Sequence, residues 1–283
     1  MQLIIGFLLA VGVAGLAYQL HLLSRSGAAA AVWLGALVFG LGGLEWAILL
    51  VAFFGSSSGL TRFSARRKQD LAAAFSKGGQ RDAGQVLANG GLAGLFVVAH
   101  ALWPSQNWPW VAFAGTLAAV NADTWATELG VLSSALPRIM PTFQPVERGT
   151  SGGVTLAGVL AAAGGGLWIA ILTVLFWPGQ AILPLAGGLN LPAPWTRTAS
   201  FGLAISLAAV IGSLVDSLLG ATLQAIYFCP NCARETELFP IHTCGAATTR
   251  VRGLAWLGND GVNVACAMTG SIIAVVWLFV QEF

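Results

Sequence analysis

Three aspartates stand in polar surroundings inside or at the ends of long apolar stretches: Asp123, Asp216 and Asp260. An ionisable side chain within a membrane costs about 2.5–3.5 kcal/mol even on lenient insertion scales, so it marks a functional site by default. The most specific pattern surrounds Asp216, because one narrow helix face there carries Ser213, Asp216, Ser217, Gly220 and Gln224. Packing of small residues would explain the serines and the glycine but not the carboxylate. We therefore expect this face to line the interior of a helix bundle or a wet cavity.

The stretch NADTWATELG, residues 121–130, places two carboxylates in apolar surroundings. On a straight helix Asn121, Thr124 and Glu128 share one face, whereas Asp123 points away from it. A straight helix therefore cannot aim both carboxylates at one point. Either the helix is broken here, or Asp123 and Glu128 serve neighbouring subsites. We expect Glu128 to act at the helix end or to support the groups that touch the ligand.

The last apolar segment opens with Asn259, Asp260 and Asn263, which lie within about 100° of helical arc. Three aspartates from three helices, each with Asn, Ser or Thr nearby, are typical of a site for a hard divalent cation. Magnesium prefers carboxylate oxygens, keeps several waters and usually brings a substrate phosphate with it. We therefore expect Asp123, Asp216 and Asp260 to bind Mg²⁺.

A basic loop predicted at residues 59–82 supplies candidate phosphate ligands at the same end of the spans. Lys77 precedes a glycine pair, whose backbone N–H groups can hold phosphate oxygens. Arg81, Gln85 and Asn89 share a helix face, so a basic and polar surface enters the bilayer beside the carboxylates. Such a surface suits a phosphate-bearing ligand bridged by a metal. Ordinary positive-inside charge is the competing interpretation of the segment RFSARRK.

A glycine-rich stretch, ERGTSGGVTLAG at residues 147–158, lies on the same side and leads through Thr155 into another span. Helix N-termini preceded by Gly and Thr can bind anions, although glycine is abundant throughout this chain. Neither the P-loop pattern GxxxxGKS/T nor the fingerprint GxGxxG occurs in the sequence. Any nucleotide site is therefore of neither type.

A small cluster of potential metal ligands follows the Asp216 segment. Cys229 and Cys232 form a C-x2-C pair, and His242 and Cys244 form an H-x-C pair. Tetrahedral zinc takes such sets of three cysteines and one histidine, and with all four positions filled its role is structural. Free thiols or a redox pair are the alternatives. Cys266 lies within an apolar segment and is expected to pack there.

Composition identifies the elements that must position these residues. The chain of 283 residues is 57% hydrophobic and only 8% charged, with a mean hydropathy of +0.79. Soluble domains are about 45–50% apolar and roughly 25% charged, so we expect an all-α, polytopic transmembrane bundle forming one domain, 1–283. The predicted spans are 2–23, 27–42, 43–58, 83–103, 108–131, 153–176, 199–228 and 257–280. Only GLGG at 40–43 separates the second and third spans, so seven spans is the alternative.

The distribution of Lys and Arg predicts the orientation. Eight spans place Arg25 and the loops 59–82, 132–152 and 229–256 on one side, with 12 of the 13 basic residues. Basic residues concentrate in cytoplasmic loops. We therefore expect these loops, including the Cys/His loop at 229–256, in the cytoplasm and both termini outside. The carboxylate motifs lie at the same ends of their spans, which predicts a cytoplasmic-membrane protein whose site faces the cytoplasm.

Six motifs, in this order, cover nearly the whole chain: FFGSSSGLTRF, KGGQRDAGQVLANGG, NADTWATELG, GTSGGVTLAG, GSLVDSLLGATLQ and LGNDGVN. Together they resemble the transmembrane protein nineteen family, integral membrane proteins long catalogued as a domain of unknown function. That family includes the phytyl-phosphate kinase of plant vitamin E synthesis. The resemblance implies a membrane enzyme that transfers a phosphoryl group from CTP, or another nucleoside triphosphate, to an isoprenoid lipid monophosphate. It implies Mg²⁺ as cofactor and membrane lipids as surroundings, and no nucleic acid as partner.

Carried onto this chain, the resemblance assigns the three aspartates to magnesium, and Lys77, Arg81 and Arg62 to phosphates. The further residues expected to contact nucleotide or lipid phosphate are Asp82, Asn89, Asn121, Thr124, Glu128, Thr155, Ser213, Ser217, Gln224, Asn259 and Asn263. The lipid chain would lie between helices, with its headgroup meeting the nucleotide at the membrane surface. A lipid-phosphate cytidylyltransferase, and a transporter or flippase of a lipid phosphate or anion, are the alternatives. A homodimer is left open.

Overall fold

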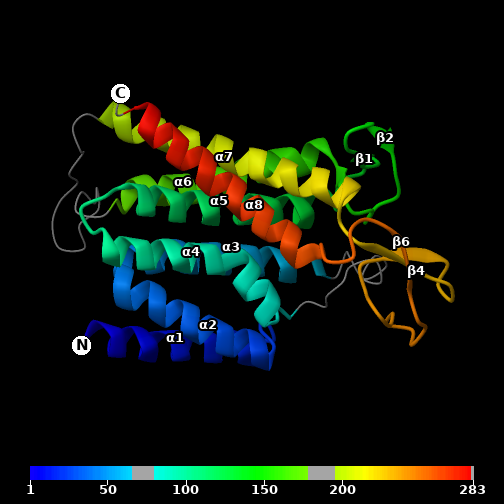
Figure 1. Ribbon diagram of the computed structural model, residues 1–283, viewed down its shortest axis with the longest axis horizontal. Coiled ribbons are helices and arrows are strands. Elements are labelled where there is room, and N and C mark those ends of the chain that lie inside the picture. Colours follow the sequence, from blue (N-terminus) through cyan, green and yellow to red (C-terminus); the bar gives the residue numbers. More distant parts are fainter. Residues whose placement is uncertain (66–79, 178–194, 282–283) are drawn as a thin grey trace.

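The computed structural model describes residues 1–65, 80–177 and 195–281, and this part of the chain is mainly α-helical. The helices run side by side along the long dimension of the molecule, with both termini at one end (Figure 1). They are α1 (Gln2–Gln19), α2 (Arg25–Leu37), α3 (Leu44–Ala65), α4 (Ala83–Leu102), α5 (Trp108–Gly130), α6 (Leu156–Leu175), α7 (Trp195–Thr222) and α8 (Asn259–Val280). Seven segments of the described chain are long and apolar enough to cross a membrane. The predicted polytopic helical membrane protein is confirmed.

Helix α5 lies at the centre of the bundle, where it packs against α3, α4, α6, α7 and α8. Every residue from Pro109 to Ala122 is buried. Because protein rather than lipid surrounds α5, its surface does not need to be lipid-like, and α5 is not among the seven apolar segments. This central position carries the polar end of α5, with Asp123 and Glu128, into the interior of the bundle.

The predicted break between the second and third spans is present. Helix α2 widens into a π-helical turn, η1 (Val38–Gly42), and α3 begins at Leu44. Between them Gly43 has a φ of +89°, a backbone conformation that favours glycine. The chain can therefore turn back between two candidate spans, Arg25–Gly42 and Leu44–Ser64, and pack both helices in the same bundle.

Helix α3 extends beyond its predicted end at residue 58 and continues to Ala65. The first part of the predicted basic loop, 59–65, is therefore helical, and Arg62 lies in the last turn. Contacts with α5 explain the extension, because Thr61 and Ser64 both donate hydrogen bonds to Glu128. Lys77 and the rest of this loop up to residue 79 lie outside the described residues.

Two small antiparallel sheets, which the sequence did not predict, lie at the end of the bundle opposite the termini (Figure 1). The first has the order β2–β1–β3, with β1 (Arg138–Ile139), β2 (Gln144–Pro145) and β3 (Gly153–Val154). The second has the order β5–β4–β6, with β4 (Ile226–Cys229), β5 (Arg234–Thr236) and β6 (Thr249–Arg252). The seventh span was predicted to reach residue 228, but α7 ends at Thr222. The run Ile226–Cys229 is apolar enough to resemble a helix end, yet it pairs with strands on both sides.

Candidate active site

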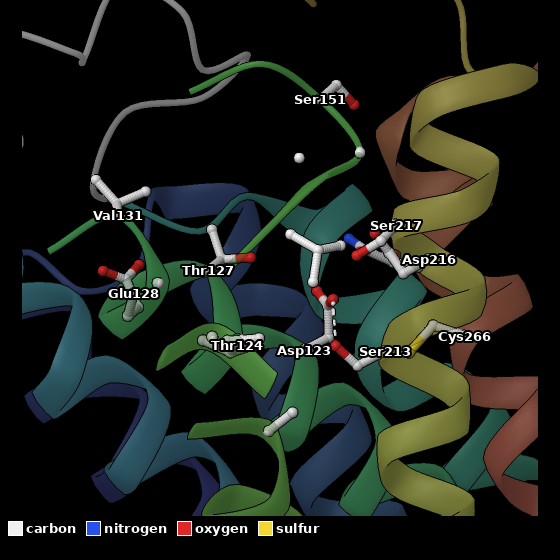
Figure 2. A pocket seen from close by; sticks show the side chains of 18 of the residues that line it. Asp123, Thr124, Thr127, Glu128, Val131, Ser151, Ser213, Asp216, Ser217 and Cys266 are labelled. Atoms are coloured by element: carbon white, nitrogen blue, oxygen red, sulfur yellow. Dashed lines mark hydrogen bonds between the residues drawn. The ribbon is translucent and has the colours of Figure 1, made fainter. Parts of the chain in front are cut away.

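A polar cavity of about 450 Å³ lies at the sheet end of the bundle. Its walls come from the C-terminal parts of α5 and α7, the N-terminal parts of α4, α6 and α8, and the loop 148–155 (Figure 2). The predicted site residues that line it are Arg81, Asn89, Asp123, Thr124, Glu128, Thr155, Ser213, Asp216, Ser217, Gln224, Asn259 and Asn263. Segments that are far apart in sequence thus converge on one polar space.

Asp123 and Asp216 line this cavity from the neighbouring helices α5 and α7 (Figure 2). Ser213 donates a hydrogen bond from its Oγ to Asp123 Oδ1 at 3.2 Å. Asp216 Oδ2 is buried and has no hydrogen-bond partner within the described part of the chain. A buried carboxylate oxygen without a partner is costly. It therefore points to a cation, a ligand or water as the missing partner.

A hard divalent cation fits the donors at this place. Two carboxylates and the side-chain oxygens of Asn259 and Asn263 face one cavity, and these are ligands that Mg²⁺ accepts. The structure does not place Asp260, the predicted third carboxylate, among the cavity residues. Side chains four apart share a helix face, so the two asparagines face the cavity while Asp260 is turned away by about 100°. Its carboxylate instead lies in the first turn of α8, where it complements the helix dipole.

Glu128 lines a different part of the same cavity, because α5 is one unbroken helix. The side chain is 7% exposed and accepts hydrogen bonds from Thr61, at 3.1 Å, and from Ser64. Of the two arrangements that the sequence allowed, the structure has the one with the two acids at neighbouring positions (Figure 2). Glu128 also joins α3 to α5, so it shapes the cavity as well as lining it.

Asn121 is fully buried and does not line the cavity. Its Oδ1 accepts hydrogen bonds from Ser56 and Ser57 of α3, both at 3.0 Å. Its Nδ2 donates to the carbonyl oxygen of Gly165 in α6 at 2.8 Å. The amide thus joins three helices, and the predicted contact with nucleotide or lipid is replaced by a structural role. The next polar residue on this face, Thr124, does line the cavity.

Arg81 is a basic residue that lines the cavity, and hydrogen bonds on both sides of its peptide backbone fix its position. Its N–H donates to the Leu22 carbonyl at 2.9 Å, and its carbonyl accepts from the Ser24 N–H at 3.0 Å. Its guanidinium lies over the rings of Phe53 and Phe54, 5.6 and 5.7 Å from their centres. Burial lowers the pKa of Arg81 to about 10, while the charge of Glu128 opposes this shift. The guanidinium therefore stays protonated at neutral pH and can attract an anion.

Two other predicted binding residues lie outside the cavity. Arg62 is exposed, and its Nη1 donates to the carbonyl of Leu20 at 3.5 Å. Asp82 is the N-cap of α4: its Oδ1 accepts from the Gln85 N–H at 2.9 Å, and Gln85 Oε1 accepts from the Asp82 N–H at 3.3 Å. This reciprocal capping box explains the residue without a ligand.

The loop 148–155 closes one side of the cavity and is fixed on the end of α7. Ser151 Oγ donates to Gln224 Oε1 at 3.0 Å, and Gln224 Nε2 donates to Glu237 Oε1 at 2.8 Å. Gly152 has a φ of +82°, and a Cβ there would lie 2.4 Å from the backbone nitrogen of Ala221. Only glycine fits this contact, which explains one glycine of the motif GTSGG by packing.

A second cavity, of about 620 Å³, lies beside the polar one and is almost entirely apolar. Helices α1, α2, α3, α4 and α6 form its walls, with Leu34, Phe53 and Trp168 among the side chains. Arg81, Gln85 and Asn89 line both cavities. The N-terminal turns of α4 thus connect a polar space with an apolar one.

Comparison with known proteins agrees with this architecture. Residues 8–271 match a family described as integral membrane protein DUF92. The chain belongs to this family. The resemblance noted from the six motifs is thereby confirmed.

Several relatives can be aligned over most of the chain. Protein PGR of Arabidopsis thaliana is 35% identical over 84% of this chain and 84% of its own length. An uncharacterized membrane protein of Methanocaldococcus jannaschii is 27% identical over 83% of this chain and 76% of its own. The chloroplastic protein VTE6 of Arabidopsis thaliana is 26% identical over 92% of this chain and 66% of its own. No solved structure matches the chain.

The cavity of this DUF92 member also contains residues that the sequence analysis did not select. They are Thr61, Thr127, Arg148, Ser151, Glu237 and Cys266. Arg148 and Ser151 belong to the glycine-rich stretch, so treating that stretch as one ligand-binding loop would have included them. Glu237 carries no such signal, because it reaches the cavity only through the fold of the second sheet.

Proposed function

We propose that this DUF92 member transfers a phosphoryl group from a nucleoside triphosphate, with CTP as the expected donor, to the phosphate of an isoprenoid lipid. One observation carries the proposal. The polar cavity contains a buried carboxylate oxygen that has no partner among the described residues, and it adjoins an apolar cavity through three shared residues, one of them the cation Arg81. A lipid phosphate has a matching division into a charged head and an apolar chain.

In this arrangement the isoprenoid chain occupies the apolar cavity and its phosphate lies near Arg81 and Asn89. The nucleotide phosphates lie between the loop 148–155 and α7. Asp123 and Asp216 would hold Mg²⁺, which neutralises charge on the phosphates when bound. Phosphoryl transfer depends mainly on positioning and charge stabilisation, and the lipid phosphate oxygen is itself the nucleophile. The site therefore requires no strong base.

The family relationship supports the reaction class, because the motifs resemble a family that includes a phytyl-phosphate kinase. The same family includes proteins with no assigned chemistry, such as the relative from Methanocaldococcus jannaschii. The isoprenoid chain and the CTP donor come from the resemblance, whereas the division into head and tail sites comes from the two cavities.

The deciding experiment incubates the purified chain with Mg²⁺, radiolabelled CTP or ATP, and phytyl, geranylgeranyl or undecaprenyl phosphate. We expect a lipid diphosphate and release of a nucleoside diphosphate. Asp216→Asn should lower the rate about 100-fold or more, as loss of a group that stabilises the transition-state charge does. Asp260→Asn, a matched change outside the cavity, should keep most of the rate.

Other products would identify other functions. Release of pyrophosphate with a cytidylated lipid would indicate a cytidylyltransferase. No conversion of any lipid, together with movement of lipid phosphate across liposomes that survives Asp216→Asn, would contradict the kinase and favour transport.

The proposal also predicts on which side of the membrane the site lies. We infer that the sheet end faces the cytoplasm, because the loops predicted there hold 12 of the 13 basic residues. A reporter that is active only outside the cytoplasm should then be active when it is fused to the C-terminus. A reporter that is active only inside the cytoplasm should be active when it is inserted at Gly245. The reverse pattern would place the site on the other face.

A further inference from the structure

Four potential metal ligands gather in the second sheet, beyond the end of α7. Cys229 ends β4, Cys232 lies in the turn before β5, and His242 and Cys244 lie in the loop before β6. Their ligand atoms all lie within 4.8 Å of one another. These side chains come from two short turns, so the folding of the sheet, and not one local sequence, brings the four ligand atoms close together.

The distances fit a tetrahedral metal site and not a disulfide. Cys229 Sγ lies 3.5 Å from Cys244 Sγ, and His242 Nδ1 lies 3.2 Å from Cys244 Sγ and 3.6 Å from Cys232 Sγ. With Zn–S near 2.3 Å and Zn–N near 2.0–2.1 Å, the edges of a tetrahedron are about 3.4–3.8 Å. A disulfide would require about 2.05 Å between sulfurs. Three of the six separations between the ligand atoms are therefore close to those of a zinc tetrahedron, and none exceeds 4.8 Å.

The backbone around the cluster is shaped for two tight turns. Ala233, directly after Cys232, has a φ of +49°, and Gly245, directly after Cys244, has a φ of +85°. The Gly245 N–H donates to the carbonyl of His242 at 2.9 Å, which closes the second turn. A non-glycine residue rarely adopts a positive φ, so the turn at Ala233 needs support from its surroundings.

The segment that carries the cluster has little apolar interior of its own. Between Ile226 and Arg252 its aromatic contact is the stack of Tyr227 on Phe239, with ring centres 4.7 Å apart, and Phe239 itself is 63% exposed. Extensions of this size generally need disulfides or metals because their cores are too small. We propose that Cys229, Cys232, His242 and Cys244 bind one Zn²⁺, which stabilises this segment. All four positions are protein ligands, so the ion is structural.

The same segment reaches the polar cavity, so zinc binding would also affect residues of that cavity. Glu237 follows β5 and accepts the hydrogen bond of Gln224 at 2.8 Å. From β6, Arg252 Nη1 donates to the carbonyls of Gly220 and Ala221 at 2.9 and 2.8 Å and so caps the end of α7. Zinc binding would therefore hold Glu237 and the end of α7 in place, although it takes no part in the reaction proposed above.

Metal analysis of the purified full-length chain tests the site directly. We expect about one zinc per chain by mass spectrometry, and X-ray absorption showing three sulfurs near 2.3 Å and one nitrogen near 2.0–2.1 Å. Cys244→Ser should lower the zinc content severalfold, whereas Cys244→His, which restores a ligand, should retain more of it. Thr243→Ser and Cys266→Ser control for a change within the turn and for loss of a thiol elsewhere.

A second measurement applies to the unaltered protein, so it does not depend on whether a variant folds. Zinc is removed with a thiol-reactive mercurial and a chelator, and then restored after reduction. Trypsin should cut at Arg234 or Arg250 faster without zinc and return to the initial rate with it. Four outcomes would each overturn the proposal. Two concern zinc content: protein purified from zinc-supplemented cells contains no zinc, or the double variant Cys229→Ser/Cys232→Ser retains it. The other two are a disulfide found by intact mass and a cleavage rate that zinc does not change.

Discussion

Ser213 of α7 donates a hydrogen bond to Asp123 of α5, with 3.2 Å between Ser213 Oγ and Asp123 Oδ1. The bond joins the two helices that carry the carboxylates of the polar cavity. It fixes one oxygen of Asp123 while Asp216 Oδ2 has no partner within the described residues. A carboxylate oriented in this way is pre-arranged for a cation, because less ordering is left for the binding step.

The first prediction concerns this bond. Ser213→Ala should raise the Mg²⁺ concentration for half-maximal activity about 10–100-fold, as loss of a group that orients a metal ligand does. Ser206→Ala is the matched control, because the Ser206 hydroxyl donates to the Gly202 carbonyl of its own helix at 2.9 Å. The measurement is a magnesium titration of the phosphoryl-transfer rate. Equal titration curves for both variants would show that Ser213 does not position Asp123.

Arg81 provides the second prediction, because it lines both cavities while Arg62 lines neither. Hydrogen bonds to charged groups contribute about 1.5–3 kcal/mol, so Arg81→Gln should raise the KM for the lipid phosphate about 10–100-fold. Arg62→Gln, the same change on an exposed side chain, should leave KM within about twofold. A similar rise in both variants would indicate general attraction by positive charge instead of a specific contact.

The contrast between these arginines shows what the sequence could predict. Both stand in a basic segment, and the residue types alone do not separate them. Arg81 enters the cavity because its backbone pairs with Leu22 and Ser24, residues distant in sequence. The spacing of Ser213, Asp216 and Ser217 was informative, because helical periodicity alone brings these three side chains to one face.

The structure corrects those predictions that depend on tertiary contacts, because the helical periodicity of a sequence carries no information about such contacts. Asp260 was expected in the metal site, but the rotation of α8 presents Asn259 and Asn263 instead. Glu237 was not expected there, since a strand pairing of the second sheet carries it to Gln224. The sequence pattern was therefore sufficient for the faces of single helices and insufficient for their rotation and for the loops.

The third prediction concerns the apolar cavity as the site of the lipid chain. Ala47→Trp adds an indole to its wall and should lower the rate with geranylgeranyl phosphate about 10-fold or more relative to geranyl phosphate. Leu95→Trp is the control, because Leu95 is 65% exposed and lines neither cavity. The measurement is the ratio of kcat/KM for the two lipids. An unchanged ratio in Ala47→Trp would place the chain elsewhere.

The fourth prediction separates a structural asparagine from a catalytic one. Asn121 is fully buried, accepts from Ser56 and Ser57, and donates to Gly165. Asn121→Ala removes all three bonds, and although Ser56 keeps the Phe53 carbonyl as a partner, the buried Ser57 hydroxyl is left with none among the described residues. A buried unsatisfied group of this kind costs about 1–3 kcal/mol.

We therefore expect Asn121→Ala to lower the unfolding temperature in detergent by several degrees, with KM for nucleotide and lipid unchanged in the folded fraction. Thr116→Val is the matched control, because Thr116 is equally buried but donates only to the Ala112 carbonyl of its own helix. Ligand contact at Asn121 would give the opposite result, a raised KM at an unchanged unfolding temperature. Because the two readouts move independently, one experiment distinguishes a helix-joining amide from a ligand-binding one.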